Sequence, residues 1–459
     1  MKRSIALGAA ALLLVSLAGC SAGTEAKSTP IASGAPGPSA LAKAKGVTEI
    51  SFWHGLGGIN AQALQSLVDE FNSENAGKIK VDTSAQGSYP DLLAKYTASL
   101  RDKSTPTVTL SNDISSGFLH DVGRSVSPEA MAAANPGDLK LGQLAPAGKR
   151  YYSVDGKLVA VPMNMSTPLL FVNTGLLQKA GVDPSSLNTL DGLAAAAKKV
   201  TDSTGVPGIA QAFDDWWFEQ LSATSGNLYC TPENGRGTKS ADAVSFQKPS
   251  QVKAFTTMAD LYKAGAGLDV GTDNNNAVTA FAAGKTAMMF NSSAVAASVA
   301  NSTTFSYIAL PFPLSASSAK AGTVVGGSAM WLSNQAAPAE QVAGWKLISF
   351  LASPASQAKF SEATGYVPAN TALENSSARK AYLAAHPVAQ VAIDEVENVP
   401  DVPASHGCFT GAFSAIRAAM IPQMQAAFSG SKSMKQALSD ATTAANQAIS
   451  DYKQQLAGD

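Results

Sequence analysis

The sequence has little charge and lacks the short motifs that mark the commonest enzyme and metal sites. Charged residues make up 15% and hydrophobic residues 45% of the 459 residues, which is typical of a globular protein. His-Glu-x-x-His and Cys-x-x-Cys do not occur, and Gly-x-Ser-x-Gly occurs only at residues 19–23, at the end of the apolar N-terminal stretch, so zinc hydrolysis and the usual serine chemistry lack their expected signatures. Gly284–Thr286 copies the end of a phosphate-binding loop, but Thr279 stands where its first glycine belongs. The four histidines are widely separated, and we expect no catalytic residue, metal or cofactor.

The charge balance gives no sign of a nucleic-acid partner. The formal net charge is −1, and loss of Lys2 and Arg3 with a cleaved N-terminal segment would lower it by two, to −3. Nucleic-acid-binding surfaces are usually strongly basic. We therefore expect no nucleic acid among the partners.

An apolar run marks the N-terminus. Lys2-Arg3 precedes an apolar stretch from Ile5 to Leu17, which is too short to span a membrane and indicates a secretory signal over residues 1–19. Its Leu-Ala-Gly-Cys ending resembles the lipobox of bacterial lipoproteins. That resemblance implies a lipid, such as palmitate, on Cys20, with the protein outside the cytoplasm and anchored to the cell membrane. The alternative is an ordinary secretory signal. Residues 20–46, rich in Ser, Ala, Gly and Pro, are expected to form a flexible tether.

Only two cysteines remain beyond this segment. In an oxidising compartment Cys230 and Cys408 are candidates for one disulfide. Two separate buried thiols fit the sequence equally well.

Length and periodicity favour an α/β fold with two lobes. A chain of 459 residues is too long for one ordinary core. The strand-like stretch 49–53 is followed by Leu64, Leu67, Val68 and Phe71 at helical spacing, and then by a second strand at 79–83. This β-α-β order predicts a mostly parallel sheet covered by helices.

A crossing between the lobes is expected in the stretch 159–173. Two apolar runs flank Asn164–Thr167, with Pro162 and Pro168 on either side. Proline cannot donate to a central ladder, so both prolines predict edges, bends or strand starts. Small polar side chains at such a crossing favour a ligand pocket between the lobes.

Some polar and aromatic residues have both a structural and a functional interpretation. Tyr89 and Asp113 lie in loops that leave strands, where α/β proteins bind ligands, although Asp113 could equally cap a helix. Trp216 and Trp217 could line a pocket, but aromatic pairs are more often core. Arg417 follows apolar helix residues, and position alone favours an exposed arginine over a buried anion clamp.

The ordered motifs resemble the extracytoplasmic solute-binding proteins (family 1) of ABC importers, specifically the glycerol-3-phosphate and glycerophosphodiester group. The similarity runs from about Glu49 to the C-terminus, and its most specific parts are Phe52-Trp53-His54-Gly55, Gly87-Ser88-Tyr89, Asn164-Met165-Ser166-Thr167-Pro168, Gly326-Gly327-Ser328-Ala329-Met330-Trp331, Gly365-Tyr366-Val367-Pro368 and Ile416-Arg417.

The resemblance implies a two-lobed binding protein with discontinuous lobes and a hinge cleft. We expect lobe one at 47–162 with 311–370 and lobe two at 163–310 with 371–459. It further implies a monomer without catalytic activity that delivers its ligand to a separate permease and ATPase.

The family's ligand contacts can be transferred to matching positions. They are Tyr89, Asp113, Ser166, Ser292, Gly327, Tyr366 and Arg417, with Asp113 in place of the usual glutamate. Leu190 stands where some relatives that take glycerol-3-phosphate have tryptophan. The smaller side chain favours a glycerophosphodiester such as glycerophosphocholine, with Trp216 or Trp217 facing its quaternary ammonium.

Two other functions stay open from the sequence. A sugar or oligosaccharide receptor of the same importer class would use stacked aromatics and would not need Arg417. A secreted phosphodiesterase would need a metal set or a nucleophile with its base, which the sequence does not display.

Overall fold

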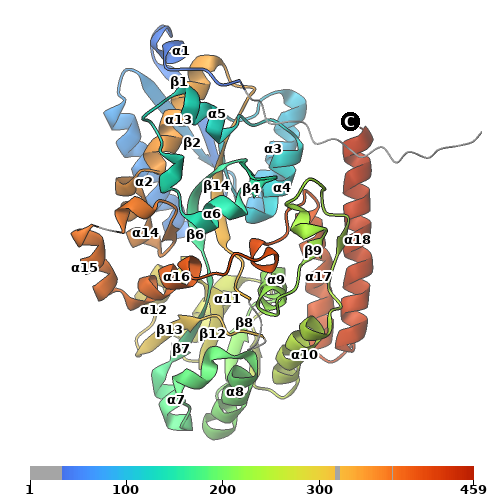
Figure 1. Cartoon of the computed structure of the whole chain (residues 1–459). Helices are drawn as coiled ribbons and strands as arrows, with labels where there is room; N and C mark the ends of the chain where they lie inside the picture. Colours follow the sequence, from blue (N-terminus) through green and yellow to red (C-terminus); the bar gives the residue numbers. More distant parts are fainter. Residues whose placement is uncertain (1–33, 316–320, 375, 459) are drawn as a thin grey trace, which may run out of the picture.

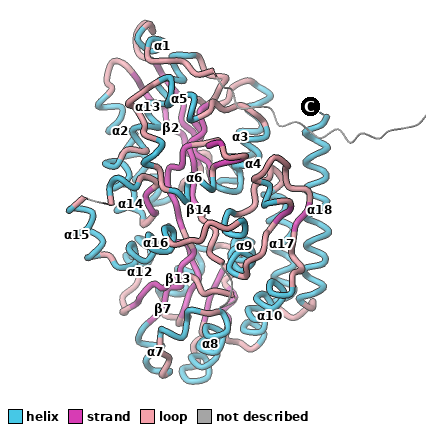
Figure 2. The backbone as a smooth tube through the Cα atoms, in the orientation of Figure 1, coloured by secondary structure: helices cyan, strands magenta, loops and turns pink. Residues whose placement is uncertain are grey.

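The computed structural model describes residues 34–315, 321–374 and 376–458, which form two lobes, each built on its own sheet (Figure 1). The predicted signal and Cys20 lie outside these residues. Strand order is β15-β6-β14-β3-β1-β2 in the first sheet and β11-β8-β12-β7-β13 in the second. Helices cover both sheets, with the strands running through the interior (Figure 2). The predicted two-lobed α/β fold is confirmed.

The first lobe begins with the predicted β-α-β unit. β1 (Thr48–His54) pairs in parallel with β2 (Ile79–Ala85) and with β3 (Val108–Asn112), and α2 (Gly58–Glu74) connects the first two. The four apolar residues at helical spacing in α2 are all buried. α3 (Tyr89–Asp102) starts with a capping box, because the Ser88 hydroxyl accepts from the Asp91 N–H and the Asp91 side chain accepts from Ser88.

β6 (Val161–Ser166) and β14 (Gly326–Leu332) complete the first sheet in antiparallel register, together with the short β15 (Val367–Pro368). Pro162 lies inside β6, where the register with β14 shifts as at a bulge. β15 pairs only with Asn164 and Met165, so among the described residues β6 has no paired strand on that side at Pro162. The proline therefore occupies a local edge, as its missing N–H requires.

The second sheet joins β7 (Pro168–Asn173), β12 (Met288–Ser292), β13 (Tyr307–Pro311), β8 (Ile209–Gln211) and β11 (Gly267–Asp269). Its largest core cluster also takes in α8 (Leu190–Thr204), α9 (Asp215–Thr224), α10 (Pro249–Lys263), α17 (Phe413–Phe428) and α18 (Met434–Gly458). Thr189 caps α8, since its hydroxyl accepts from the Gly192 N–H at 3.1 Å.

The chain crosses between the two sheets at residues that differ from the expected lobe boundaries. β6 continues through residue 163 to Ser166, and Pro168 already begins β7, so Thr167 alone separates the two sheets. Pro311 ends β13 of the second sheet. The tether expected over residues 20–46 also differs in its last part, because α1 (Ser39–Ala42) packs on the first lobe and the Pro36 carbonyl accepts from Asn135.

The remaining helices and two short ribbons complete the structure. The helices are α4 (Asp113–Asp121), α5 (Pro128–Ala134), α6 (Pro146–Tyr151), α7 (Thr174–Ala180), α11 (Asn274–Ala282), α12 (Ala296–Ser302), α13 (Pro338–Leu351), α14 (Pro354–Thr364), α15 (Ser377–Ala385) and α16 (Pro387–Glu397). Two ribbons pair β4 (Ser153–Val154) with β5 (Lys157–Leu158) and β9 (Cys230–Thr231) with β10 (Ala243–Val244).

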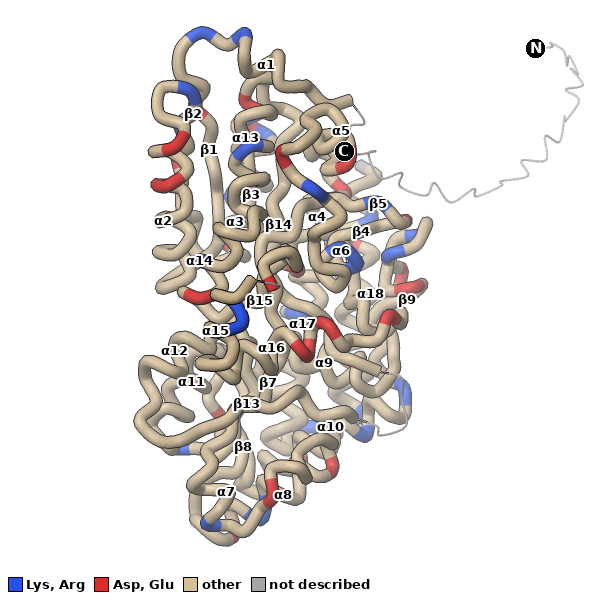
Figure 3. Tube along the Cα trace, turned by 60° about the vertical axis from the view of Figure 1, so that its left-hand side comes forward, with Lys and Arg blue, Asp and Glu red and all other residues tan. Residues whose placement is uncertain are grey.

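Charged residues are spread over the outer helices and loops (Figure 3). Among the helices in the described ranges, we find none with both the length and the apolar character to cross a bilayer.

Candidate ligand-binding site

Three of the expected contact residues surround the crossing at Thr167. Ser166 ends β6 and pairs with Gly326, next to Gly327. Ser292 ends β12 and pairs with Pro168. The Thr167 N–H donates to the Ser293 hydroxyl at 3.2 Å, and the Thr167 carbonyl accepts from the Ser293 N–H at 2.9 Å. These bonds bring Ser166, Ser292 and Gly327 to one junction between the sheets.

Gly327 is required by a close backbone approach. Its φ is +129°, and a Cβ there would lie 2.2 Å from the Asn164 carbonyl oxygen of β6. The glycine therefore packs β14 against β6, and its expected contact with a ligand stays a prediction. A Cβ on neighbouring Gly326 would lie 2.8 Å from the Ser166 hydroxyl and 3.4 Å from the Trp216 ring. Ser166 and Trp216 thus both lie against Gly326.

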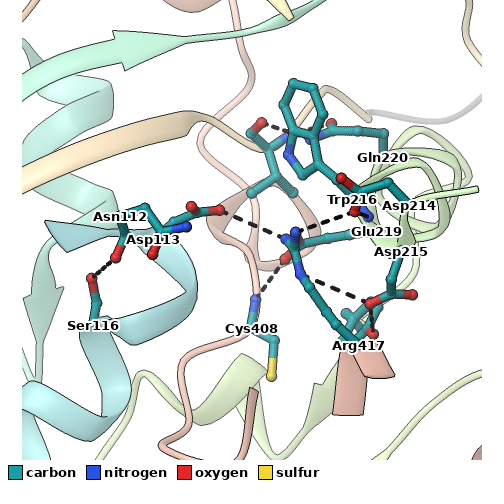
Figure 4. A network of polar contacts seen from close by, with 12 residues as sticks. Asn112, Asp113, Ser116, Asp214, Asp215, Trp216, Glu219, Gln220, Cys408 and Arg417 are labelled. Carbon is teal, nitrogen blue, oxygen red and sulfur yellow. Dashed lines mark hydrogen bonds and ion pairs between the residues drawn. The ribbon is translucent and has the colours of Figure 1, made fainter. Parts of the chain in front are cut away.

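Arg417 is buried on α17 among carboxylates from two other helices. Its side chain is 9% exposed. Nη2 lies 3.0 Å from a Glu219 carboxylate oxygen (Figure 4). Other nitrogen–oxygen pairs join the guanidinium to Asp113 and Asp214 at 3.7 Å and to Asp215 at 3.9 Å. The exposed position that the helix pattern favours for Arg417 is wrong, because these acids compensate the buried charge.

The approach of Asp113 to Arg417 depends on a small residue in α4. A Cβ on Gly117, one turn after Asp113, would lie 2.2 Å from the Thr410 carbonyl carbon. The glycine lets the chain segment before α17 pack directly on α4. Asp113 begins α4 and is 8% exposed. Its side chain therefore reaches from the first lobe to an arginine of the second.

Burial and mutual repulsion shift the pKa values of the acids. Burial is the largest cause in each case, and the Arg417 charge opposes it: the pKa of Asp215 rises to about 8 and that of Glu219 to about 7. The pKa of Asp113 also rises. Burial alone would lower the pKa of Arg417, but the four carboxylates raise it above its ordinary value. The guanidinium thus stays charged, while part of the acid cluster holds protons near neutral pH.

Tyr89 and Tyr366 lie on the first-lobe side of the same site. Tyr89 begins α3 and packs on Gly55, whose Cβ would come within 2.5 Å of the ring. Tyr366 precedes β15 and stacks on Phe360 with ring centroids 5.8 Å apart. Burial raises the pKa of Tyr366 to about 12, with a further rise from Asp113. Burial also raises the pKa of Tyr89, with added contributions from Tyr366 and Asp113. The two phenols and this carboxylate are therefore electrostatic neighbours.

The adjacent tryptophans have different environments. Trp217 is fully buried and stacks with Phe290 and Phe312, at centroid distances of 5.7 and 6.1 Å. Trp216 is 8% exposed and lies at the start of α9, beside the crossing. The core interpretation holds for Trp217, and only Trp216 adjoins the expected contacts.

Leu190 is a core residue of the second lobe. It begins α8, is 2% exposed and belongs to the main apolar cluster there. Its N–H donates to the Leu314 carbonyl at 3.0 Å. This burial argues against the ligand contact expected for Leu190, which stays untested.

Sequence reasoning missed three acids of the cluster. Asp214 caps α9 by accepting from the Trp216 N–H, and Asp215 and Glu219 follow within the same helix. The signal was the spacing of Asp215 and Glu219, which places two carboxylates on one helix face amid apolar residues. Their partner lies about two hundred residues away in the sequence, so only the fold reveals the pairing.

A disulfide supports the site from behind. Cys230 and Cys408 are joined, with Cα atoms 5.7 Å apart. The Cys408 N–H donates to a Glu219 oxygen at 3.1 Å, while the other oxygen pairs with Arg417 (Figure 4). The linked segment therefore helps to orient Glu219.

Two cavities lie on either side of α16, away from Arg417. One cavity, of about 380 Å³, is lined by residues from the segments 184–188, 310–314, 321–322 and 395–400. The other, of about 370 Å³, lies between α6, β15 and α16. Neither lining includes Arg417 or Asp113. The second cavity is lined by charged residues of its own, Lys149, Arg150, Glu374 and Glu397, so the site at Arg417 is a candidate that rests on the burial of its charges.

The comparisons with known proteins agree on one family. The model of the bacterial extracellular solute-binding proteins matches residues 66–387. The sn-glycerol-3-phosphate-binding periplasmic protein UgpB of Escherichia coli strain K12 is 28% identical over 422 residues, which cover 90% of this chain and 95% of that protein. UgpB of Pectobacterium atrosepticum is 26% identical over 421 residues, covering 90% and 94%.

Solved structures share the fold at lower identity. UgpB from Mycobacterium tuberculosis in complex with glycerophosphocholine has a TM-score of 0.74 and 19% identity, covering 88% of this chain and 99% of that one. The cyclic alpha-maltosyl-1,6-maltose binding protein from Arthrobacter globiformis has a TM-score of 0.72 and 21% identity, with the same coverage. The two-lobed fold and the matched family model together show that this chain belongs to the bacterial extracellular solute-binding proteins of ABC importers.

Proposed function

We propose that this chain captures a glycerophosphodiester, such as glycerophosphocholine, or sn-glycerol-3-phosphate. The observation that carries this function is Arg417, a buried guanidinium between the two sheets with Tyr89, Tyr366 and Ser166 on surrounding elements. A guanidinium offers paired donors to phosphate oxygens, and phenols and hydroxyls add neutral donors. The relatives named for sn-glycerol-3-phosphate support the same ligand class.

The acid cluster favours a diester over a monoester. A phosphate monoester carries about −1.5 to −2 charges at neutral pH, whereas a diester carries a single negative charge. Asp214, together with the ionised fraction of Glu219, repels the more highly charged ligand more strongly. Asp214 and the Trp216 ring also suit a quaternary ammonium. The preference for glycerophosphocholine thus rests on the carboxylates and Trp216 rather than on Leu190.

Calorimetry on the mature chain tests this function. We expect glycerophosphocholine to bind more tightly than sn-glycerol-3-phosphate, and Arg417→Lys to weaken both by at least about tenfold, because lysine keeps the charge but loses the paired donors. Tighter binding of the monoester would refute the diester preference. Unchanged affinity in Arg417→Lys would refute phosphate recognition by Arg417.

A sugar receptor is the second candidate. The four carboxylates already compensate Arg417, and carboxylates with a tryptophan can also bind neutral hydroxyls. Binding of a disaccharide with no measurable binding of either phosphate ligand would establish it. Recovery of unchanged ligand after incubation would argue against the phosphodiesterase alternative.

We further propose that the protein acts as a monomer and delivers its ligand to permease and ATPase subunits from a lipid anchor at Cys20. In membrane fractionation, Cys20→Ser should move the protein from the membrane to the soluble fraction. Retention of the variant in the membrane would contradict the anchor.

A further inference from the structure

A second buried arginine lies close to the candidate site. Arg236 follows the ribbon strand β9 and is 8% exposed. Its Nε donates to the Gly407 carbonyl at 2.9 Å, and its Nη1 donates to the Tyr151 carbonyl. The guanidinium lies over the Tyr151 ring, 4.3 Å from the centroid, and over Phe409 at 5.1 Å. Nη2 is buried and has no hydrogen-bond partner among the described residues.

Two consecutive buried tyrosines next to Arg236 also carry unpartnered polar atoms. Tyr151 ends α6 and Tyr152 follows it, with ring centroids 5.0 Å apart and exposures of 2% and 1%. Within the part of the chain that the structure describes, neither hydroxyl has a hydrogen-bond partner. A buried polar group without a partner is costly, and three of them on side chains that pack together require an explanation.

Gly407 shows how close this group is to the Arg417 cluster. Its φ is +70°, and a Cβ there would lie 3.0 Å from Cε2 of Tyr151 and 3.1 Å from a Glu219 carboxylate oxygen. The tyrosine ring and the carboxylate therefore meet across one glycine. The same carboxylate pairs with Arg417.

The tyrosine hydroxyls also lie in the field of the expected contact residues. Burial raises the pKa of Tyr151, and Asp113, then Glu219, raise it further. Burial likewise raises the pKa of Tyr152, with Asp113 as the next cause and Tyr89 among the others. Both phenols are thus electrostatically coupled to Asp113.

We propose that Tyr151, Tyr152 and Arg236 form a second polar subsite, which binds the hydroxyl groups of the ligand while Arg417 binds its phosphate. The proposal rests on the proposed function. The phenols and Nη2 of Arg236 donate to ligand hydroxyl oxygens, and the ligand hydroxyls donate to Asp113 or Glu219. The positive charge of Arg236 repels an ammonium group, so the quaternary ammonium of a choline ligand would lie beside Trp216 instead.

Removal of single hydroxyl groups from both the protein and the ligand tests the subsite. Calorimetry, with displacement titration for weak binding, compares the wild type, Tyr151→Phe and Tyr152→Phe. The ligands are sn-glycerol-3-phosphate and propyl phosphate, which keeps the phosphate but lacks both hydroxyls. Each variant should bind the first ligand about threefold to tenfold more weakly and the second with unchanged affinity.

Controls separate this role from a structural one. Tyr96→Phe removes the hydroxyl of another buried tyrosine, on α3, and should change neither affinity. The unliganded Tyr151→Phe and Tyr152→Phe proteins should melt at the wild-type temperature or above, because they lose an unpartnered hydroxyl. Equal losses for both ligands, or no loss for either, would overturn the subsite.

Failure of the proposed function gives a different result. If the wild type binds a disaccharide and neither phosphate, the ligand class is wrong. The same two variants are then titrated with that disaccharide. A loss of affinity for the disaccharide of about threefold or more would support a hydroxyl-binding subsite, and unchanged affinity would refute it.

Discussion

Arg417 and Arg236 are both buried at the junction between the lobes, but their partners differ in kind. Arg417 faces four carboxylates, and these raise its pKa above the ordinary value. Arg236 is held by two backbone carbonyls and two aromatic rings, and burial lowers its pKa. One cation is thus compensated by formal charge, and the other mainly by dipoles and π faces. Loss of the first should therefore be more costly.

The largest effect is expected for Arg417→Ala. The substitution leaves a cluster of buried acids without its cation, and we expect a loss of about 3–5 kcal/mol in the free energy of unfolding. Urea denaturation measures it. Adding Glu219→Gln should restore part of the loss, since one buried carboxylate is removed. A loss below about 1 kcal/mol would show that the acids become protonated without penalty.

A smaller effect is expected for Arg236→Met, which keeps an apolar stem against Tyr151 and Phe409. The two carbonyls lose their donors, and we expect a loss of about 1–3 kcal/mol. The same urea experiment applies. A larger loss than in Arg417→Ala would reverse the comparison between the two arginines.

A pH dependence of stability, centred on the Arg417 region, is expected as well. Asp215 and Glu219 have folded pKa values of about 8 and 7, mainly because of burial, whereas an unfolded chain releases these protons near pH 4. Between those limits the folded state binds more protons, so its stability falls as the pH rises.

The unliganded protein should accordingly melt at a lower temperature at pH 8.5 than at pH 6. Calorimetric melting curves measure this difference. Glu395 and Asp121, with pKa values raised to about 7 and about 6, contribute in the same direction. Glu219→Gln should reduce the slope, while Arg236→Met should leave it nearly unchanged. A melting temperature that rises with pH would contradict the cluster's raised pKa values.

Local patterns in the sequence predicted local structure well. The spacing of Leu64, Leu67, Val68 and Phe71 placed α2 between two parallel strands. Pro162 and Pro168 located the crossing to within a few residues of Thr167. These features depend on neighbours in the chain, which the sequence displays directly.

The environment of a side chain was harder to predict. Arg417 has apolar neighbours along α17, and its acidic partners come from α4 and α9. Trp216 and Trp217 are adjacent in sequence, yet one packs within the core and the other faces the crossing. Leu190 was chosen by position in the family, and its burial became visible only with the fold. Such properties depend on which elements meet in space.

The disulfide between Cys230 and Cys408 also bears on the order in which the site is completed. Cys408 and Arg417 lie close to the C-terminal end, whereas Asp113 and Tyr151 belong to the first third of the chain. A chain that is synthesised from its N-terminus carries an unfinished site until almost all of it has emerged. The residues that hold Glu219 and Arg236 in place are thus among the last to become available, and the first lobe can fold before any ligand can be held.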